Sequence, residues 1–345
     1  MAVTGREDAV QAEQPHVVTI RDVADAAKVS ITTVSHVFNR PDRVAEETRR
    51  RVSEVAAELA YRPNVHARQL VTRKSCSLAI QVAGHFVRNE HALVPNSEYF
   101  LEILNGASRA ADDRGYALIL TPPDIDPYAL DSFAVDGVLL VDPAGNEPIL
   151  AQPNRLQRIV TAGRPQSASE VLSVVDNDHH AAAIAVMEHL HANGYERPAV
   201  LVSDKSRSYV VDLIAGYRKW VRRHQRRSIV IDLDRHASTT SALDTLLERG
   251  ADAVYTSSEN IALDVLQEAR RRGIDVPTTL GLCSAVDSGI LQLTSPQISG
   301  MFLHPREIGR RATNLLIDLV EGVAEPGSAV EIPVRLMERD STRRS

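Results

Sequence analysis

A short stretch near the start of the chain places hydrogen-bonding side chains on one face of a helix. In residues 31–39 (ITTVSHVFN), Val34 and Val37 recur three residues apart and predict the face that points inward. The remaining face offers three hydroxyls and an imidazole, from Thr32, Thr33, Ser35 and His36. Short hydroxyl side chains reach base edges and phosphates without a large loss of side-chain entropy, so the predicted chemistry is hydrogen bonding to a nucleic acid.

Helix signals before and after this stretch position it. Thr19 precedes a helical pattern over residues 20–27 and is followed three residues later by Asp22, as in a capping box. Ser30 is placed to cap the helix of residues 31–39, and a third helix is predicted from Ala45. A helix, a tight turn and a second helix form the motif that lays its second helix in the major groove of DNA. A generic three-helix bundle explains the caps equally well, so the caps alone leave both interpretations open.

The charge of the chain is unevenly distributed. Residues 17–75 carry eleven Lys and Arg against seven Asp and Glu, a balance of +4, whereas the whole chain carries −6 and the remainder therefore −10. A basic segment on an acidic body is typical of a protein that binds nucleic acid through one part only.

Length and composition set further bounds. The chain has 345 residues, 43% hydrophobic and 24% charged, which predicts a globular protein of two or three structural units. No apolar run approaches the roughly 18 residues of a membrane span, so no membrane partner is expected. Two cysteines, Cys76 and Cys283, give no disulfide framework. The polar first 16 residues predict a disordered arm and no secretory signal, and we expect a bacterial cytoplasmic protein associated with the nucleoid.

The stretch after the third helix predicts a conditional element. Pro63 ends that helix, and Asn64 is placed to cap a new helix over residues 64–70. A helix this short is marginal in water unless something packs on it. Two copies in a dimer, lying in the minor groove with Leu70 wedged between base steps, would stabilise it. An ordinary interdomain linker is the alternative that the residues themselves favour.

Four sequence strings decide between these alternatives by resemblance. TIRDVADAAKVSITTVSHVFNR, RVAEETRRRV, ELAYRPN and ARQL resemble, in order and spacing, the DNA-binding head and hinge of the lactose-repressor (LacI/GalR) family of bacterial transcription regulators. The resemblance implies that part of the head contacts the major groove and that the hinge contacts the minor groove. The DNA-contacting residues it implies are Thr19, Ile31, Thr32, Thr33, Ser35, His36, Asn39, Ala67, Arg68 and Leu70.

From Cys76 onward, short apolar runs alternate with helical patterns, which predicts parallel sheets covered by helices on both faces. We expect strands at 78–83, 117–121, 137–141, 158–162, 171–175, 199–203, 229–233, 253–256 and 280–283. Helices are expected at 99–114, 179–193, 209–224, 241–248, 261–272 and 306–320. Nine strands over this length favour two lobes.

The body resembles the periplasmic-binding-protein-like core of the same family, through ILNGASRAADDRGYALIL, VDGVLLV, TAGRP and VVDND among others. The resemblance implies one lobe of residues 76–172 plus the helix near 304–322, and another of residues 173–298 plus the C-terminal strand. The expected fold is thus α/β, with an all-α helix-turn-helix head. Its divisions are an arm (1–16), a head (17–62), a hinge (63–75) and a two-lobed effector-binding and dimerisation core (76–345).

Ligands of such lobes bind beyond the carboxyl ends of the strands, which directs attention to Asp142, Asp176 and Glu259. Compared with the family pattern, Leu213 stands where an arginine is usual and Cys283 where an aspartate is usual. Leu303 likewise replaces a glutamine. Such an apolar wall predicts an effector less polar than a sugar, with local misalignment as the alternative.

No nucleophile elbow, phosphate loop, dinucleotide fingerprint or metal-ligand spacing occurs, so neither enzyme activity nor a cofactor or metal is expected. The sequence predicts a transcriptional regulator, a repressor, that reads a near-palindromic operator in double-stranded DNA as a homodimer under the control of a small-molecule effector. Two alternatives remain: the same build with a degenerate cleft, acting as a constitutive repressor or architectural factor, and a soluble sugar-binding protein, against which the head argues.

Overall fold

The computed structural model describes residues 18–39, 41–61, 75–83, 97–122, 130, 133–152, 158–167 and 169–344. The chain divides into two compact units, Met1–Ser75 and Cys76–Ser345, and each is considered by itself. The expected arm at 1–16 lies outside the described residues, as does nearly all of the expected hinge. Within the described residues, no helix is long and apolar enough to cross a membrane.

The first unit is built from three helices: α1 (Ile20–Ala26), α2 (Ile31–Asn39) and α3 (Glu46–Glu58). A short 3-10 turn, η1 (Pro41–Arg43), lies between α2 and α3. The helices enclose a small core of Val23, Ala24, Ala27, Val34, Val37, Val52 and Ala56. The ring of Phe38 closes one side of this core against Tyr61, with the two ring centroids 5.9 Å apart. The helix-turn-helix expected from the caps is therefore present.

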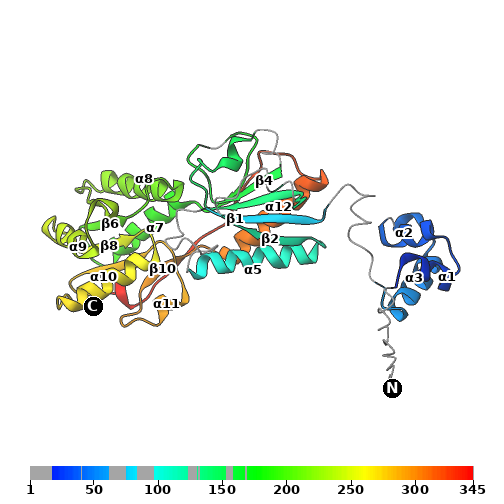
Figure 1. The fold of residues 1–345 in the computed structure, drawn as a ribbon. Coiled ribbons are helices and arrows are strands. Elements are labelled where there is room, and N and C mark those ends of the chain that lie inside the picture. Colours follow the sequence, from blue (N-terminus) through cyan, green and yellow to red (C-terminus); the bar gives the residue numbers. More distant parts are fainter. Residues whose placement is uncertain are drawn as a thin grey trace, which may run out of the picture. The chain divides into compact units, whose positions relative to one another are not determined.

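The first lobe of the second unit contains a six-stranded sheet in the order β11-β5-β4-β3-β1-β2, in which every neighbouring pair is parallel (Figure 1). Its strands are β1 (Ser77–Val82), β2 (Ala117–Thr121), β3 (Gly137–Val141), β4 (Ile159–Ala162), β5 (Ser173–Asp176) and β11 (Ala329–Glu331). Helices α5 (Glu98–Asp113) and α12 (Pro305–Glu321) cover one face and share an apolar core with the strands. A second apolar cluster, with Leu130 and Ile149, covers the other face.

The second lobe contains a six-stranded sheet in the order β12-β10-β9-β8-β6-β7, parallel except for the β10–β12 pair. Its strands are β6 (Pro198–Val202), β7 (Val230–Asp232), β8 (Ala253–Thr256), β9 (Gly281–Ser284), β10 (Ser299–Phe302) and β12 (Arg335–Met337). On one face lie α7 (His179–Ala192) and α8 (Ser208–Arg223), and on the other α9 (Thr239–Glu248) and α10 (Glu259–Arg271). Short α11 (Gly289–Gln292) follows β9.

The chain passes between the lobes after β5, after β10 and after β11. The side-chain amide of Asn177, in the first of these crossovers, donates hydrogen bonds to the backbone carbonyls of Leu303 (3.2 Å) and Ile332 (2.9 Å) in the other two. One buried asparagine therefore ties all three crossovers together. The expected lobe boundary at residue 172 is wrong, because β5 pairs with β4 and β11 and belongs to the first lobe.

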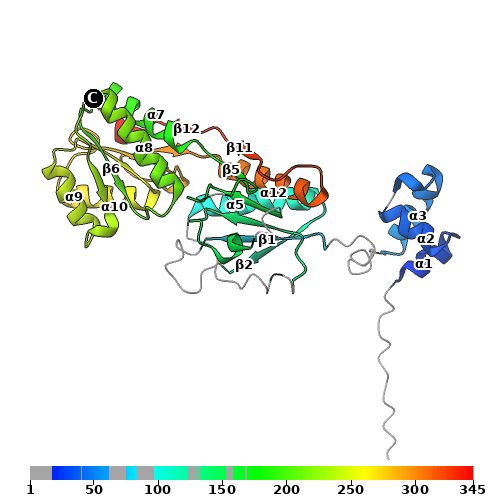
Figure 2. The ribbon, with the colours of Figure 1, turned by 90° about the horizontal axis from the view of Figure 1, so that it is seen from above.

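Two glycines allow α5 and α12 to approach each other closely, and the two helices lie side by side on one face of the sheet (Figure 2). A Cβ atom on Gly106 would lie 1.9 Å from the carbonyl oxygen of Arg306, and one on Gly309 would lie 2.1 Å from that of Ile103. Both contacts are with rigid helix backbone. The packing of the first lobe therefore requires glycine at both positions.

Candidate nucleic-acid interface and ligand cleft

Side-chain caps fix the start of both helices of the helix-turn-helix. The backbone amide and the hydroxyl of Thr19 both donate to the Asp22 carboxylate at 2.7 Å, which confirms the expected capping box. Ser30 caps α2, since its hydroxyl accepts a hydrogen bond from the Thr33 amide at 3.0 Å. In the turn between the helices, Lys28 adopts a left-handed conformation with φ 53°. The entry to α2 is therefore set by local hydrogen bonds within the turn.

The face of α2 that turns away from the core matches the predicted recognition face. Ile31 is 42% exposed and Thr32 is exposed, whereas Val34 and Val37 are buried in the three-helix core. Thr33, Ser35 and His36 are half-buried. The Thr33 hydroxyl lies 2.8 Å from that of Ser30, so it takes part in the cap as well as in the outer face.

Four residues predicted to contact DNA cannot be placed in this interface. Asn39 ends α2, but its side chain lies outside what the structure describes. The hinge residues Ala67, Arg68 and Leu70 lie outside the described residues altogether. Their predicted contacts with the minor groove remain predictions.

In the second unit, the structure brings together the three predicted acidic residues. Asp142 follows β3, Asp176 ends β5 and Glu259 begins α10, so the first two come from one lobe and the third from the other. Burial raises the pKa of Tyr99 well above its usual value, and the nearby charges of these carboxylates raise it further. Tyr99 itself packs against the apolar cores of both lobes. These groups therefore line the boundary between the lobes.

The environment of Asp142 strongly favours its protonated form. Burial, and then the negative charge of Asp176, raise its pKa to about 7, although Arg207 and His179 act in the opposite direction. Gly163 leaves room for this carboxylate, because a Cβ atom there would lie 2.4 Å from Asp142 Oδ1. Asp142 itself is half-buried.

Sequence reasoning missed the main cation of this region, Arg207. Its side chain is 1% exposed, its Nη1 donates to the backbone carbonyl of Asp142, and its Nε donates to Asp204 at 3.0 Å. Arg207 thus joins the loop before α8 to the end of β3 in the other lobe. Arg207 lies in the loop after a predicted strand, and that position was the available signal for a functional residue. The prediction for this region rested instead on Leu213, six residues later.

The predicted apolar wall is a packed core instead of a ligand-lining surface. Leu213, Cys283 and Leu303 are at most 3% exposed and belong to the apolar cluster between the second sheet and helices α7 and α8. Burial raises the pKa of the Cys283 thiol far above its usual value. The placement of Leu213 and Cys283 in the cleft is therefore wrong, because α8 turns Leu213 toward its own sheet. The expectation of a less polar effector loses its basis.

Direct hydrogen bonds join the two lobes at several points. Ser97, before α5, donates to Glu259 Oε1 at 2.6 Å, and the carboxylate of Glu98 accepts from the backbone amide of Gly289 at the start of α11. Farther along, Gln166 donates to the carbonyl of Lys205 at 2.7 Å. Among the described residues, no group of three or more His, Cys, Asp or Glu side chains is arranged to hold a metal ion.

A helix-turn-helix head followed by a two-lobed α/β unit is the architecture of ligand-controlled DNA-binding proteins. Comparison with known proteins shows which family the two parts resemble. Residues 19–64 match the model of bacterial regulatory proteins of the lacI family, and residues 187–342 match a periplasmic binding protein-like domain. The chain therefore carries a DNA-binding domain of the lacI family and, after it, a periplasmic-binding-protein-like domain.

Similar proteins cover nearly the whole chain. Catabolite control protein A of Staphylococcus xylosus is 27% identical over 341 residues, covering 94% of this chain and 99% of that protein. A solved complex of the transcriptional regulator CelR with cellobiose is 25% identical, with a TM-score of 0.67 over 94% of this chain and 99% of that one. The lac repressor dimer bound to operator and the anti-inducer ONPF shares the fold, with a TM-score of 0.73 at 21% identity over 95% of this chain and 99% of that one. The chain is therefore a DNA-binding transcription regulator with an effector-binding core.

Proposed function

We propose that this regulator represses transcription by binding, as a homodimer, a near-palindromic operator in the bacterial chromosome. The observation that carries the proposal is the geometry of α2, which is capped by Ser30, anchored by Val34 and Val37, and open to solvent at Ile31 and Thr32. A helix whose one face is packed on the core while the opposite face is exposed to solvent is suited to enter the major groove.

Base reading follows from the chemistry of the outer face of α2. Ile31 offers an apolar surface that fits a thymine methyl group, and the Thr32 hydroxyl is free to meet a base edge or a phosphate. His36 lies one turn farther along the same helix. In this proposal, these residues provide sequence preference, and the arginines provide the salt-dependent affinity.

The hinge adds a second contact in this proposal. Arg68 binds in the minor groove and Leu70 wedges between base steps, as the resemblance of the ARQL string implies. The shortness of the 64–70 segment supports the idea that it becomes helical only on DNA.

Three exposed apolar side chains support the homodimer. Leu101 on α5 is 52% exposed, while Ile290 and Leu293, in and just after α11, are 50% and 85% exposed. The hydrogen bond between Glu98 and Gly289 brings together the starts of α5 and α11, the two elements on or beside which these side chains lie. A second copy of the chain would cover this apolar surface, and a dimer presents two heads to two half-sites.

Control by a small molecule follows from the cleft. An effector that binds between the lobes changes their mutual position, and with it the population of the DNA-competent dimer. The test is fluorescence anisotropy of the full-length protein on DNA upstream of its own gene, with increasing salt and with candidate effectors. Specific binding that resists competition by unrelated DNA supports the proposal, whereas binding equal to that of unrelated DNA contradicts it.

A further inference from the structure

Helix α8 carries a groove whose lining residues belong neither to the recognition helix nor to the groups at the boundary between the lobes. Its volume is about 260 Å³. The residues that line it are Lys205, Val211, Ile214, Ala215 and Arg218. Three of these side chains are apolar, and Val211 is 45% exposed. The groove therefore presents hydrocarbon to solvent, which a side chain of a partner could cover.

A row of exposed side chains extends the groove along α8. Residues three and four apart are neighbours on a helix, so Val211, Ala215, Arg218 and Arg222 follow one another on one face. Both arginines are exposed, and so is Lys219 beside them. This face is thus apolar near the start of the helix and basic toward its end.

The positive charge of this row is concentrated on an otherwise acidic body. Residues 208–227 carry six Lys and Arg against one Asp, whereas the whole chain carries −6. Arg226 pairs with Glu196, and Arg223 Nη1 lies 3.9 Å from Glu188 Oε1. The other four cations have no ion pair within the described residues, and they are Arg218, Lys219, Arg222 and Arg227. Neighbouring like charges repel, so carboxylates brought by a partner would stabilise this surface.

The two ends of the row differ in what they can bind, and this restricts the partner. Lys205 Nζ lies 2.9 Å from Asp232 Oδ2, which leaves Arg218 as the unpaired cation at the groove. A nucleic-acid backbone would pair with the arginines but has no apolar side chain to cover Val211. From Val211 to Arg222 the row is about 16 Å long, at about 1.5 Å per residue, which exceeds the reach of a small anion. A protein segment with both apolar and acidic side chains fits the whole row.

We propose that α8 docks an acidic, amphipathic segment of a partner protein. An apolar side chain of that segment fills the groove over Val211 and Ala215, and its carboxylates pair with Arg218 and Arg222. The inference goes beyond operator binding and effector control, since it gives this regulator a surface for a second protein.

The test is fluorescence anisotropy of a labelled, alanine-based helical peptide with the full chain. The peptide carries two central leucines flanked by two glutamates on each side. One matched peptide has alanines in place of the leucines, and another has glutamines in place of the glutamates. We expect the first peptide to bind with a Kd below about 100 μM, and each matched peptide to bind at least about tenfold more weakly.

Variants of α8 locate the binding site. Arg218→Glu together with Arg222→Glu should weaken binding of the acidic peptide by at least about tenfold, and the milder Arg218→Gln, Arg222→Gln should act in the same direction. Arg158→Glu with Arg249→Glu makes the same change in charge at exposed positions elsewhere in the second unit and should leave the affinity unchanged. Operator binding by each variant, measured in parallel, should equal that of the wild type and shows that the chain is folded.

Three results would overturn the inference. The first is no binding of the acidic peptide up to about 1 mM, and the second is equal affinity for all three peptides. The third is an equal loss of affinity in the α8 variants and in the charge control. If the peptide does not bind while unrelated duplex DNA binds more weakly to the α8 variants than to the control, the row contacts nucleic acid and not a protein.

Discussion

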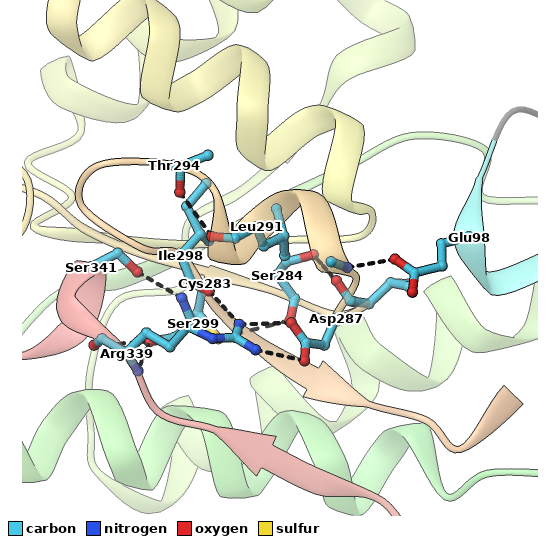
Figure 3. Close-up of polar contacts among 12 residues, drawn as sticks. Glu98, Cys283, Ser284, Asp287, Leu291, Thr294, Ile298, Ser299, Arg339 and Ser341 are labelled. Carbon is cyan, nitrogen blue, oxygen red and sulfur yellow. Dashed lines mark hydrogen bonds and ion pairs between the residues drawn. The ribbon is translucent and has the colours of Figure 1, made fainter.

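Arg339 and Asp287 form a buried ion pair that fastens the C-terminal segment to the loop carrying α11 (Figure 3). The guanidinium donates to both carboxylate oxygens, at 2.7 and 2.8 Å, and to the carbonyl of Ile298 at 2.7 Å. The Ser299 hydroxyl accepts a hydrogen bond from the backbone amide of Arg339 and donates one to the backbone carbonyl of Arg339. These two bonds hold the C-terminal segment at a second point. The two charged side chains are only 9% and 5% exposed, so neither has water as an alternative partner.

We predict that Arg339→Met destabilises the second unit by about 3–5 kcal/mol, because Asp287 is left buried without its cation. The double variant Arg339→Met, Asp287→Leu should recover most of the loss. Urea unfolding provides the measurement, with Arg109→Met on the exposed face of α5 as control. A single variant no less stable than this control would contradict the role of the pair.

A second prediction at the residue scale concerns the cap of α2. Ser30→Ala removes the acceptor of the Thr33 amide and should cost about 1 kcal/mol, or about a fivefold faster amide exchange in α2. Ser30→Asn, which can still cap, should restore the wild-type exchange rate. Equal exchange in Ser30→Ala and the wild type would show that the cap does not hold this helix.

Individual residues show where sequence reasoning succeeds and fails. Asp142, Asp176 and Glu259 were singled out because ligands of such lobes bind beyond the carboxyl ends of the strands. Leu213 failed because the direction of a helical side chain depends on the turn at which the helix begins, and no sequence period fixes this for a helix buried on several sides. Arg207 was not found because its one signal, a place in the loop after a predicted strand, is shared by every other residue of that loop.

At the scale of elements, the crossing of α5 and α12 gives the sharpest prediction. Gly309→Ala places a Cβ atom against the carbonyl of Ile103 and should destabilise the core by about 1–3 kcal/mol. Ser108→Ala, on the exposed side of α5, serves as control and should leave the unfolding midpoint unchanged. An unchanged midpoint for Gly309→Ala would mean that the helices can separate freely.

The elements with a clear period were predicted well, and those without one were not. The predicted strands at 117–121, 137–141 and 253–256 agree to the residue with β2, β3 and β8. Strands β10, β11 and β12 were not predicted individually, since their pairing depends on segments that are distant in the sequence. The same reason explains why β5 was assigned to the wrong lobe.

At the scale of the whole molecule, the apolar surface on α5 and α11 predicts how two chains meet. If the chain dimerises through this surface as proposed, Ile290→Glu together with Leu293→Glu should leave a monomer and weaken operator binding, because the two heads then bind independently. Val323→Glu is the matched control, since Val323 is 75% exposed just after α12. Light scattering measures the mass, and an intact dimer in the double variant would place the interface elsewhere.

If α2 is the recognition helix, it determines which DNA sequences the protein prefers. Selecting bound duplexes from a pool of random sequences measures that preference most directly. The full chain should enrich one near-palindromic site, and His36→Ala or Thr32→Ala should shift the enriched bases at positions that are symmetric between the half-sites. Enrichment of no common site, or of an identical site by the wild type and both variants, would contradict the assignment of α2 as the recognition helix.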